Sequence, residues 1–131
     1  MRKPEEFENF PDELARLAAF GPYRAVVRHI VDGDTLDLLV SVGFNTYVYL
    51  TVRVRLIDTP ELNSRDTAER TRAQAARDFV LTNLTPVGSH VVVTTFKDRQ
   101  TFGRYVADIT LADGRDFAKE VIAAGHAVAI A

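Results

Sequence analysis

The chain contains no cysteine, no long apolar run and almost no net charge, and each absence excludes a class of protein. Without cysteine, neither a disulfide framework nor a thiolate metal site can form. No apolar stretch is long enough to cross a membrane, and the first ten residues carry acidic side chains rather than the apolar core of a signal peptide. We therefore expect a cytoplasmic protein, or a secreted one if a leader has been removed.

The formal net charge of −2 argues against a protein that coats nucleic acid non-specifically, because such proteins carry a basic excess. It is compatible with an enzyme that binds one or two phosphates locally. A length of 131 residues, of which 47% are hydrophobic, suits one compact domain. We divide the chain into an N-terminal extension, residues 1–20, with a possible short helix over 11–20, and one domain over residues 21–131.

Alternating apolar side chains predict three strands in the first half of this domain, over residues 23–31, 35–42 and 46–57. In the third strand one face is apolar and is predicted to be core, and the other carries Tyr47, Tyr49 and Arg53. The predicted core positions of the second and third strands are Leu36, Leu38, Val40, Val42, Val48, Leu50, Val52, Val54 and Leu56.

Two helices and two more strands are predicted after residue 65. Asp66 is a candidate N-cap, with Glu69 placed to complete a capping box, for a helix that runs to residue 84. Strands over 91–97 and 103–111 and a helix over 116–124 follow. This order predicts an α+β protein, mainly β, in which a five-stranded barrel of the oligonucleotide-binding (OB) type carries packed helices. Another small α+β fold stays compatible with the order alone.

Charged side chains gather at two strand ends where a barrel does not need them. Asp32 and Asp34 flank Gly33, either as an ordinary tight turn or as hard oxygen ligands for Ca²⁺ or Mg²⁺. The stretch from Arg53 to Glu61 contains two arginines, two acids and a threonine, either as solvated strand residues and a turn or as the parts of a metal-assisted hydrolase.

Taken together, these motifs resemble those of the staphylococcal nuclease-like (thermonuclease) family. The resemblance runs from about residue 23 to residue 129 and rests on Val-Asp-Gly-Asp-Thr at 31–35, Arg53, Asp-Thr-Pro-Glu at 58–61, Gly103-Arg104 and Gly-His-Ala at 125–127. Phe102 stands where the family often has a tyrosine, so recognition of a terminal phosphate is expected to differ.

The resemblance implies a Ca²⁺-dependent endonuclease that hydrolyses phosphodiester bonds in DNA or RNA without regard to the sugar. By position, Asp34 and Asp58 match the metal carboxylates, and Thr59 matches a ligand that offers its backbone oxygen. Glu61 matches the proposed general base. The remaining matches are the two phosphate-binding arginines, Arg53 and Arg104, and a supporting acid near the metal, Asp32.

Two questions stay open at the level of sequence. Tyr47 and Tyr49 could stack a nucleobase or pack against a neighbouring strand. The same barrel could also be a non-catalytic module that binds nucleic acid or protein, although every metal acid, the base and both arginines are present. Oligomeric state and the choice between DNA and RNA are not predicted by any of these motifs.

Overall fold

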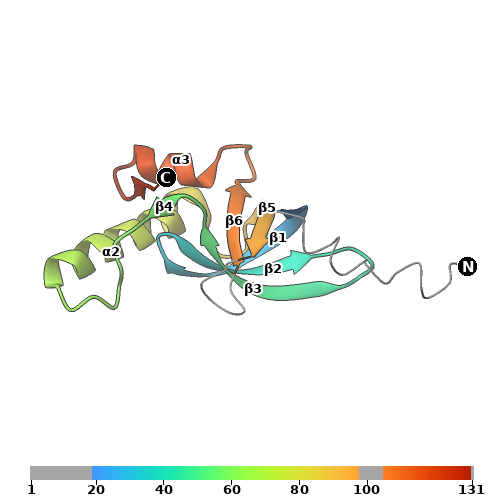
Figure 1. Cartoon of the computed structure of the whole chain (residues 1–131), viewed down its shortest axis with the longest axis horizontal. Coiled ribbons are helices and arrows are strands. Elements are labelled where there is room, and N and C mark those ends of the chain that lie inside the picture. Colours follow the sequence, from blue (N-terminus) through green and yellow to red (C-terminus); the bar gives the residue numbers. More distant parts are fainter. Residues whose placement is uncertain (1–18, 98–104, 131) are drawn as a thin grey trace, which may run out of the picture.

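The computed structural model describes residues 19–97 and 105–130, and these form a closed five-stranded barrel with helices against it (Figure 1). The strand order is β1-β2-β3-β6-β5; every neighbouring pair is antiparallel except β3 and β6, which are parallel. The barrel strands are β1 (Phe20–Asp32), β2 (Thr35–Ser41), β3 (Tyr47–Val54), β5 (His90–Lys97) and β6 (Tyr105–Thr110). The predicted α+β, OB-type barrel is confirmed.

The long first strand closes this barrel. β1 pairs with β2 on one side and with β5 on the other. Its pairing with β2 shifts register between Val27 and His29 and again between Ile30 and Asp32. Such bulges bend a strand and increase its twist, and so allow one strand to border two neighbours in a closed sheet.

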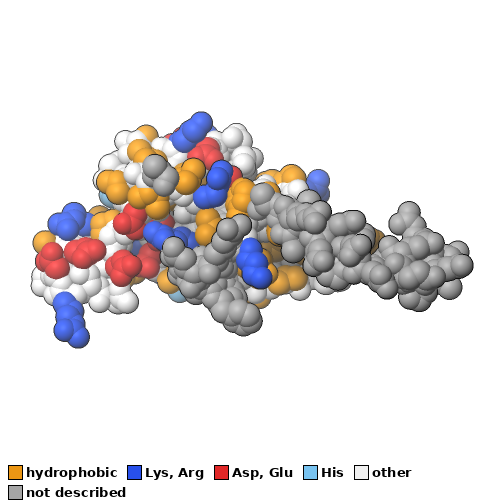
Figure 2. Space-filling view, viewed as in Figure 1, with side chains coloured by type: hydrophobic (Ala, Val, Ile, Leu, Met, Phe, Trp, Pro, Cys, Tyr) orange, Lys and Arg blue, Asp and Glu red, His pale blue; other side chains and the backbone are white. Residues whose placement is uncertain are grey.

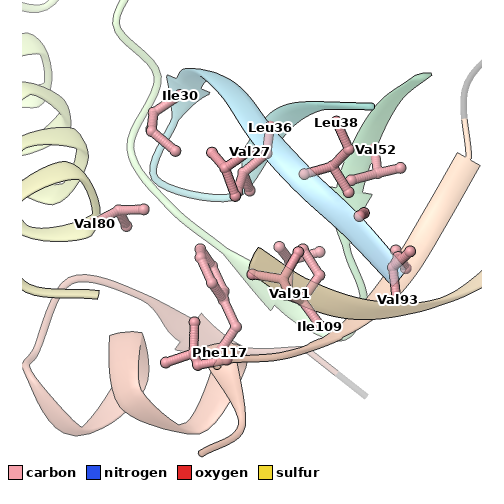
Figure 3. Packing of buried hydrophobic residues seen from close by; sticks show 14 of the residues in the cluster. Val27, Ile30, Leu36, Leu38, Val52, Val80, Val91, Val93, Ile109 and Phe117 are labelled. Atoms are coloured by element: carbon pink, nitrogen blue, oxygen red, sulfur yellow. The ribbon is translucent and has the colours of Figure 1, made fainter. Parts of the chain in front are cut away.

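Branched and aliphatic side chains fill the barrel interior (Figure 3). Phe117 and Val121 of α3 (Phe117–Ala123) belong to the same buried cluster, as does Val80, so the helices and the barrel share one core. The largest fully buried members from the barrel strands are Val27, Ile30, Leu36, Leu38, Val40, Val52, Val54, Val93 and Ile109.

The third predicted strand is shorter than its alternation indicated. β3 ends at Val54, a turn follows, and a separate two-residue strand, β4 (Ile57–Asp58), pairs with β7 (Val128–Ala129). Leu56 has a φ of 65° and is 48% exposed, so its predicted place in the core is wrong. Val42 and Val48, also predicted as core, are exposed; within the described residues, β6 pairs with β3 over residues 52–54.

The turn after β3 turns Arg55 away from the partners of Arg53. The Arg55 guanidinium donates two hydrogen bonds to Asp108 of β6, both 3.0 Å long, and lies 4.6 Å from the centre of the Phe96 ring. These bonds raise the pKa of Arg55 above its ordinary value.

We predict that Arg55→Ala lowers the free energy of unfolding by only about 1 kcal/mol, because both partners are well exposed to solvent. Thermal unfolding should show a small decrease in Tm that Arg55→Lys partly restores. A loss of several kcal/mol would contradict the prediction.

Both helices described after residue 65 begin at aspartate caps. The Asp66 side chain accepts a hydrogen bond from the Ala68 N–H at the start of α2 (Thr67–Phe79), and Asp116 does the same for Lys119 in α3. α2 continues into η2 (Val80–Leu84), a π-helical segment, so the helical region reaches residue 84 as predicted. The prediction of a capping box is wrong, however, because the Asp66 N–H donates to the Ser64 hydroxyl rather than to the Glu69 carboxylate.

At the N-terminal end, the predicted helix over residues 11–20 falls almost wholly outside the described residues. Phe20, its last predicted member, is the first residue of β1. Gly21 and Pro22 also lie within β1, where its pairing with β5 is irregular. Across the part of the chain that the structure describes, no helix is long and apolar enough to cross a bilayer.

Candidate functional site

Asp34 is buried and held by hydrogen bonds at the end of the barrel where β1 turns into β2. Its side chain is only 8% exposed. The carboxylate accepts hydrogen bonds from the Thr35 hydroxyl, at 3.0 Å, and from the backbone N–H of Thr59, at 3.2 Å. Its own carbonyl accepts from the Val54 N–H, at 2.8 Å. These bonds hold the β1–β2 turn, the end of β3 and the start of the following loop together.

Arg53 connects the two predicted metal carboxylates. In the β2–β3 register it pairs with Thr35, the neighbour of Asp34. Its Nη2 donates to Asp58 Oδ1 at 3.1 Å, and its Nε lies 3.7 Å from Asp34 Oδ2. One guanidinium therefore faces two carboxylates, while about a third of the arginine side chain stays exposed. The four residues Asp34, Arg53, Asp58 and Thr59 thus meet at one place, as the sequence predicted.

Gly33 is required here by close packing. A Cβ at this position would lie 3.0 Å from the Cβ of Ala76 in α2 and 3.2 Å from Cγ2 of Thr59. The glycine therefore lets α2 and the Thr59 loop approach the β1–β2 turn closely. Arg77 of α2 adds a 2.9 Å hydrogen bond from Nε to the Ile30 carbonyl.

We predict that Gly33→Ala lowers the free energy of unfolding by about 1–3 kcal/mol, the usual range for overpacking a tight contact. The measurement is thermal or denaturant unfolding in the absence of calcium. Ala75→Ser, on the exposed side of α2, is a suitable control and should change stability by less than about 0.5 kcal/mol. A Gly33→Ala protein as stable as the parent would show that the contact is not tight.

Asp32 lies at the edge of the site and is half-buried. Burial raises the pKa of its carboxyl above the ordinary value; the N–H of Leu62 opposes this shift, and the nearby charge of Asp34 adds to it. The Leu62 N–H donates to Asp32 at 3.4 Å. Asp32 therefore supports the loop after Thr59; its role as an acid near a metal stays a prediction.

Glu61 is exposed on this loop, and Glu69 of α2 holds the loop in place. The Glu69 carboxylate accepts a 2.6 Å hydrogen bond from the Ser64 hydroxyl and a long, 3.5 Å bond from the Glu61 N–H. Sequence reasoning missed this role, because Glu69 also has the spacing of a helix-capping residue. The polar Ser64 five residues before it was the available signal.

A hollow of about 340 Å³ opens beside Asp58 and Thr59. Glu69 and Arg72 border it from α2, and residues 125–128 border it from the opposite side. The ring of His126 lies 4.9 Å from that of Phe79, which fixes one wall. Asp58 and Thr59, the two site residues before Pro60, therefore line an open hollow.

The oxygen atoms at this site are of the types that bind a hard cation. Within the described part of the chain, protein atoms alone do not complete its coordination. Asp34, Asp58 and the Thr59 carbonyl are the oxygen types that Ca²⁺ binds. The Thr59 hydroxyl is buried and has no hydrogen-bond partner in the described structure. Among residues 19–97 and 105–130, no group of three or more His, Cys, Asp or Glu side chains is close enough to hold a metal. Water and substrate oxygens would have to complete the ligand set.

Arg104, with Phe102 and Gly103, lies outside the described residues. The first described residue after it, Tyr105, pairs with Val52, one position from Arg53. Tyr47 and Tyr49 lie on β3, both mostly exposed, and away from the carboxylates. Figure 2 shows acidic and basic side chains side by side between the α2 region and the barrel.

This end of the five-stranded barrel carries two carboxylates, an arginine paired with both and an exposed glutamate on the adjoining loop. The model of the staphylococcal nuclease homologue family matches residues 51–131, which is more than half of the chain. The chain therefore belongs to this family. The matched region contains Arg53, Asp58, Thr59 and Glu61 but begins after Asp34, whose place in the site rests on the contacts above.

Two curated relatives match nearly the whole chain. Endonuclease YhcR of Bacillus subtilis (strain 168) is 25% identical over 96% of this chain. An uncharacterized lipoprotein, MG186, of Mycoplasma genitalium (strain ATCC 33530 / DSM 19775 / NCTC 10195 / G37) is 31% identical over 92% of it. The chain spans 10% of the first relative and 48% of the second. Both relatives are therefore much longer than the region that they share with this chain.

Proposed function

We propose that the chain is a calcium-dependent nuclease that hydrolyses internal phosphodiester bonds in DNA and RNA. The observation that carries the proposal is the meeting of Asp34, Arg53, Asp58 and Thr59 at one end of the barrel, with the exposed Glu61 on the adjoining loop. The family and the name of the Bacillus relative support the same chemistry.

Each residue has a role that follows from its chemistry. Asp34, Asp58 and the Thr59 carbonyl would hold the cation, and its charge would offset that of the phosphate when it is bound. Arg53 binds two phosphate oxygens through its planar fork, as we propose for Arg104. Glu61 accepts a proton from the attacking water or orients that water. Asp32 and Glu69 hold the loop that carries Glu61.

Arg53 has one feature that favours a rival function. Its guanidinium is already engaged by Asp34 and Asp58, so a phosphate has to compete with two carboxylates. In a module that only binds nucleic acid or protein, this ion pair would be structural. In the nuclease, Asp34 and Asp58 would hold the cation, and Arg53 would then be available to bind phosphate through its planar fork.

The decisive assay uses circular single-stranded DNA and a labelled RNA, each incubated with Ca²⁺. Cleavage of the circle requires internal attack, and we expect both substrates to be cut. Binding without cleavage of either substrate would favour the non-catalytic module. Cleavage of linear but not circular DNA would replace the endonuclease with an exonuclease.

The cellular location stays a prediction. The sequence favoured the cytoplasm, whereas the Mycoplasma relative carries the name of a lipoprotein. Fractionation of the native host, followed by detection of the chain in cytoplasm, membrane and medium, distinguishes these locations.

A further inference from the structure

The hairpin formed by β2 and β3 exposes three aromatic side chains. Phe44 at its tip is 100% exposed, Tyr47 is 62% exposed and Tyr49 is 59% exposed. β6 pairs with β3 only from Val52 onward, so within the described structure this half of β3 is bonded to β2 alone. In Figure 1 the hairpin extends to the side of the barrel opposite α2. These rings contribute little to the core, and their exposure needs another explanation.

The turn at the tip holds its aromatic side chain in an uncommon conformation. Phe44 and Asn45 both have φ near 57°, and the Thr46 N–H donates to the Gly43 carbonyl at 2.9 Å. Two-residue turns of this hand favour asparagine and glycine, because a bulky side chain is disfavoured at positive φ. A phenylalanine that is both strained and fully exposed is typical of a binding element rather than of a stabilising one.

The two tyrosines lie on the same face of β3 as Arg53. Side chains alternate along a strand, so Tyr47, Tyr49, Thr51 and Arg53 share the outer face. At about 3.4 Å per residue, Tyr49 lies roughly 13 Å from Arg53 along the strand and Tyr47 roughly 20 Å. Between Tyr49 and Arg53, the Thr51 hydroxyl donates a 2.6 Å hydrogen bond to Asp37 of β2. A row of two rings therefore leads to the arginine that we assign to phosphate.

We propose that Tyr47 and Tyr49, with Phe44 at the tip, form a stacking surface for the unpaired bases of a single strand whose phosphate lies at Arg53. The proposal rests on the proposed function and specifies its substrate as single-stranded nucleic acid. Aromatic rings stack on any exposed base, whereas bases inside a duplex already stack on one another. The surface therefore extends the substrate site several nucleotides from the bond that is cut.

The charge of the hairpin favours this ligand over a membrane surface. Residues 41–50 contain no acidic or basic side chain. Interfacial membrane binding usually combines apolar side chains with lysine or arginine that attract anionic lipids. Stacking on bases needs no charge at the rings, because the phosphate charge is met at Arg53.

The binding test uses the Glu61→Gln protein with Ca²⁺ present, so that Arg53 is available to phosphate while the loss of Glu61 keeps cleavage slow over the time of the measurement. The probes are a labelled oligothymidylate, a labelled dinucleotide, a duplex of equal length and vesicles with anionic lipid. We expect the double variant Tyr47→Ser/Tyr49→Ser to bind the oligothymidylate about tenfold or more weakly, since each stacked base contributes substantially. Binding of the dinucleotide and of the duplex should not change, and Tyr49→Phe should bind as the parent does.

Val92→Ser is the matched control, because it removes an exposed apolar side chain from β5, outside the hairpin. Tyrosine fluorescence provides a second readout, since the chain has four tyrosines and no tryptophan. Unchanged oligothymidylate binding by the double variant would overturn the proposal. An equal loss of duplex binding would also overturn it. The same holds if the double variant loses vesicle binding but keeps oligothymidylate binding.

A kinetic arm separates this proposal from the proposed function. In the protein with Glu61 intact and Ca²⁺ present, the double variant should raise KM for long single-stranded DNA about tenfold and leave kcat unchanged. If the parent protein cleaves nothing but the tyrosines still control oligonucleotide binding, the stacking surface holds and the nuclease fails. If cleavage occurs with the same KM in parent and variant, the nuclease holds and the stacking surface fails.

Discussion

Replacing Arg53 by alanine is expected to lower the rate of phosphodiester cleavage at least a hundredfold while the barrel stays folded. Removing one preorganised charge partner of a transition state typically costs about 3 kcal/mol, which corresponds to about two orders of magnitude in rate. Arg53 is suited to that role because it lies at the meeting point of β3, β4 and the β1–β2 turn, with a third of its side chain open to solvent. The measurement is kcat/KM on single-stranded DNA at saturating Ca²⁺.

Companion variants define which property of Arg53 matters. Arg53→Lys keeps the charge but loses the planar fork, so it should recover only a small part of the rate. We expect Glu61→Gln and Arg104→Ala to cause losses of similar size. Arg55→Ala is the matched control, because its guanidinium is bound to Asp108 and its loss should change the rate severalfold at most. Wild-type rates in all three site variants would remove the catalytic assignment.

Asp34→Asn is expected to abolish the stabilisation of the protein by calcium. A ligand that binds only the folded state at a hundred times its Kd stabilises that state by about 2.7 kcal/mol. The parent Tm should therefore rise on addition of Ca²⁺, whereas the Asp34→Asn Tm should not. Asparagine keeps an oxygen that can accept from Thr59, so the calcium-free protein should remain folded.

Asp108→Asn is the control for this prediction. It removes a carboxylate from β6, outside the site, and its Tm should rise with Ca²⁺ as the parent Tm does. Calorimetry should give one site in the parent and in Asp108→Asn, and none in Asp34→Asn. Equal calcium binding by Asp34→Asn would contradict the metal assignment.

The barrel could be predicted from sequence because its core strands alternate cleanly. The end of β3 could not, because the apolar period continues through Leu56 although the chain turns there. The alternation of apolar side chains indicates which side of a strand a residue faces. It does not indicate where the pairing with a neighbouring strand ends. Val48 is exposed as well; among residues 19–97 and 105–130, the parallel pairing of β3 with β6 begins at Val52, four positions further on.

The site was predictable to the extent that short motifs encode it. Asp34, Arg53, Asp58 and Thr59 meet as the motifs indicated, because a two-residue turn and a strand end place them at one edge of the barrel. The hydrogen bonds of Glu69 to Ser64 and Glu61 were not predictable, because its spacing from Asp66 indicated a capping box. The packing role of Gly33 was also hidden, because an Asp-Gly pair is equally typical of an ordinary turn.

We propose that this site uses calcium to hydrolyse phosphodiester bonds, and one reversible assay tests this proposal directly. Purified protein is mixed with labelled single-stranded DNA in Ca²⁺, then with an excess of chelator, and then with Ca²⁺ restored, alongside the Glu61→Gln variant. The account predicts cleavage that stops with the chelator and resumes with Ca²⁺, and little cleavage by the variant at any stage. Intact DNA throughout, or cleavage that is equal with chelator and in the variant, would contradict it.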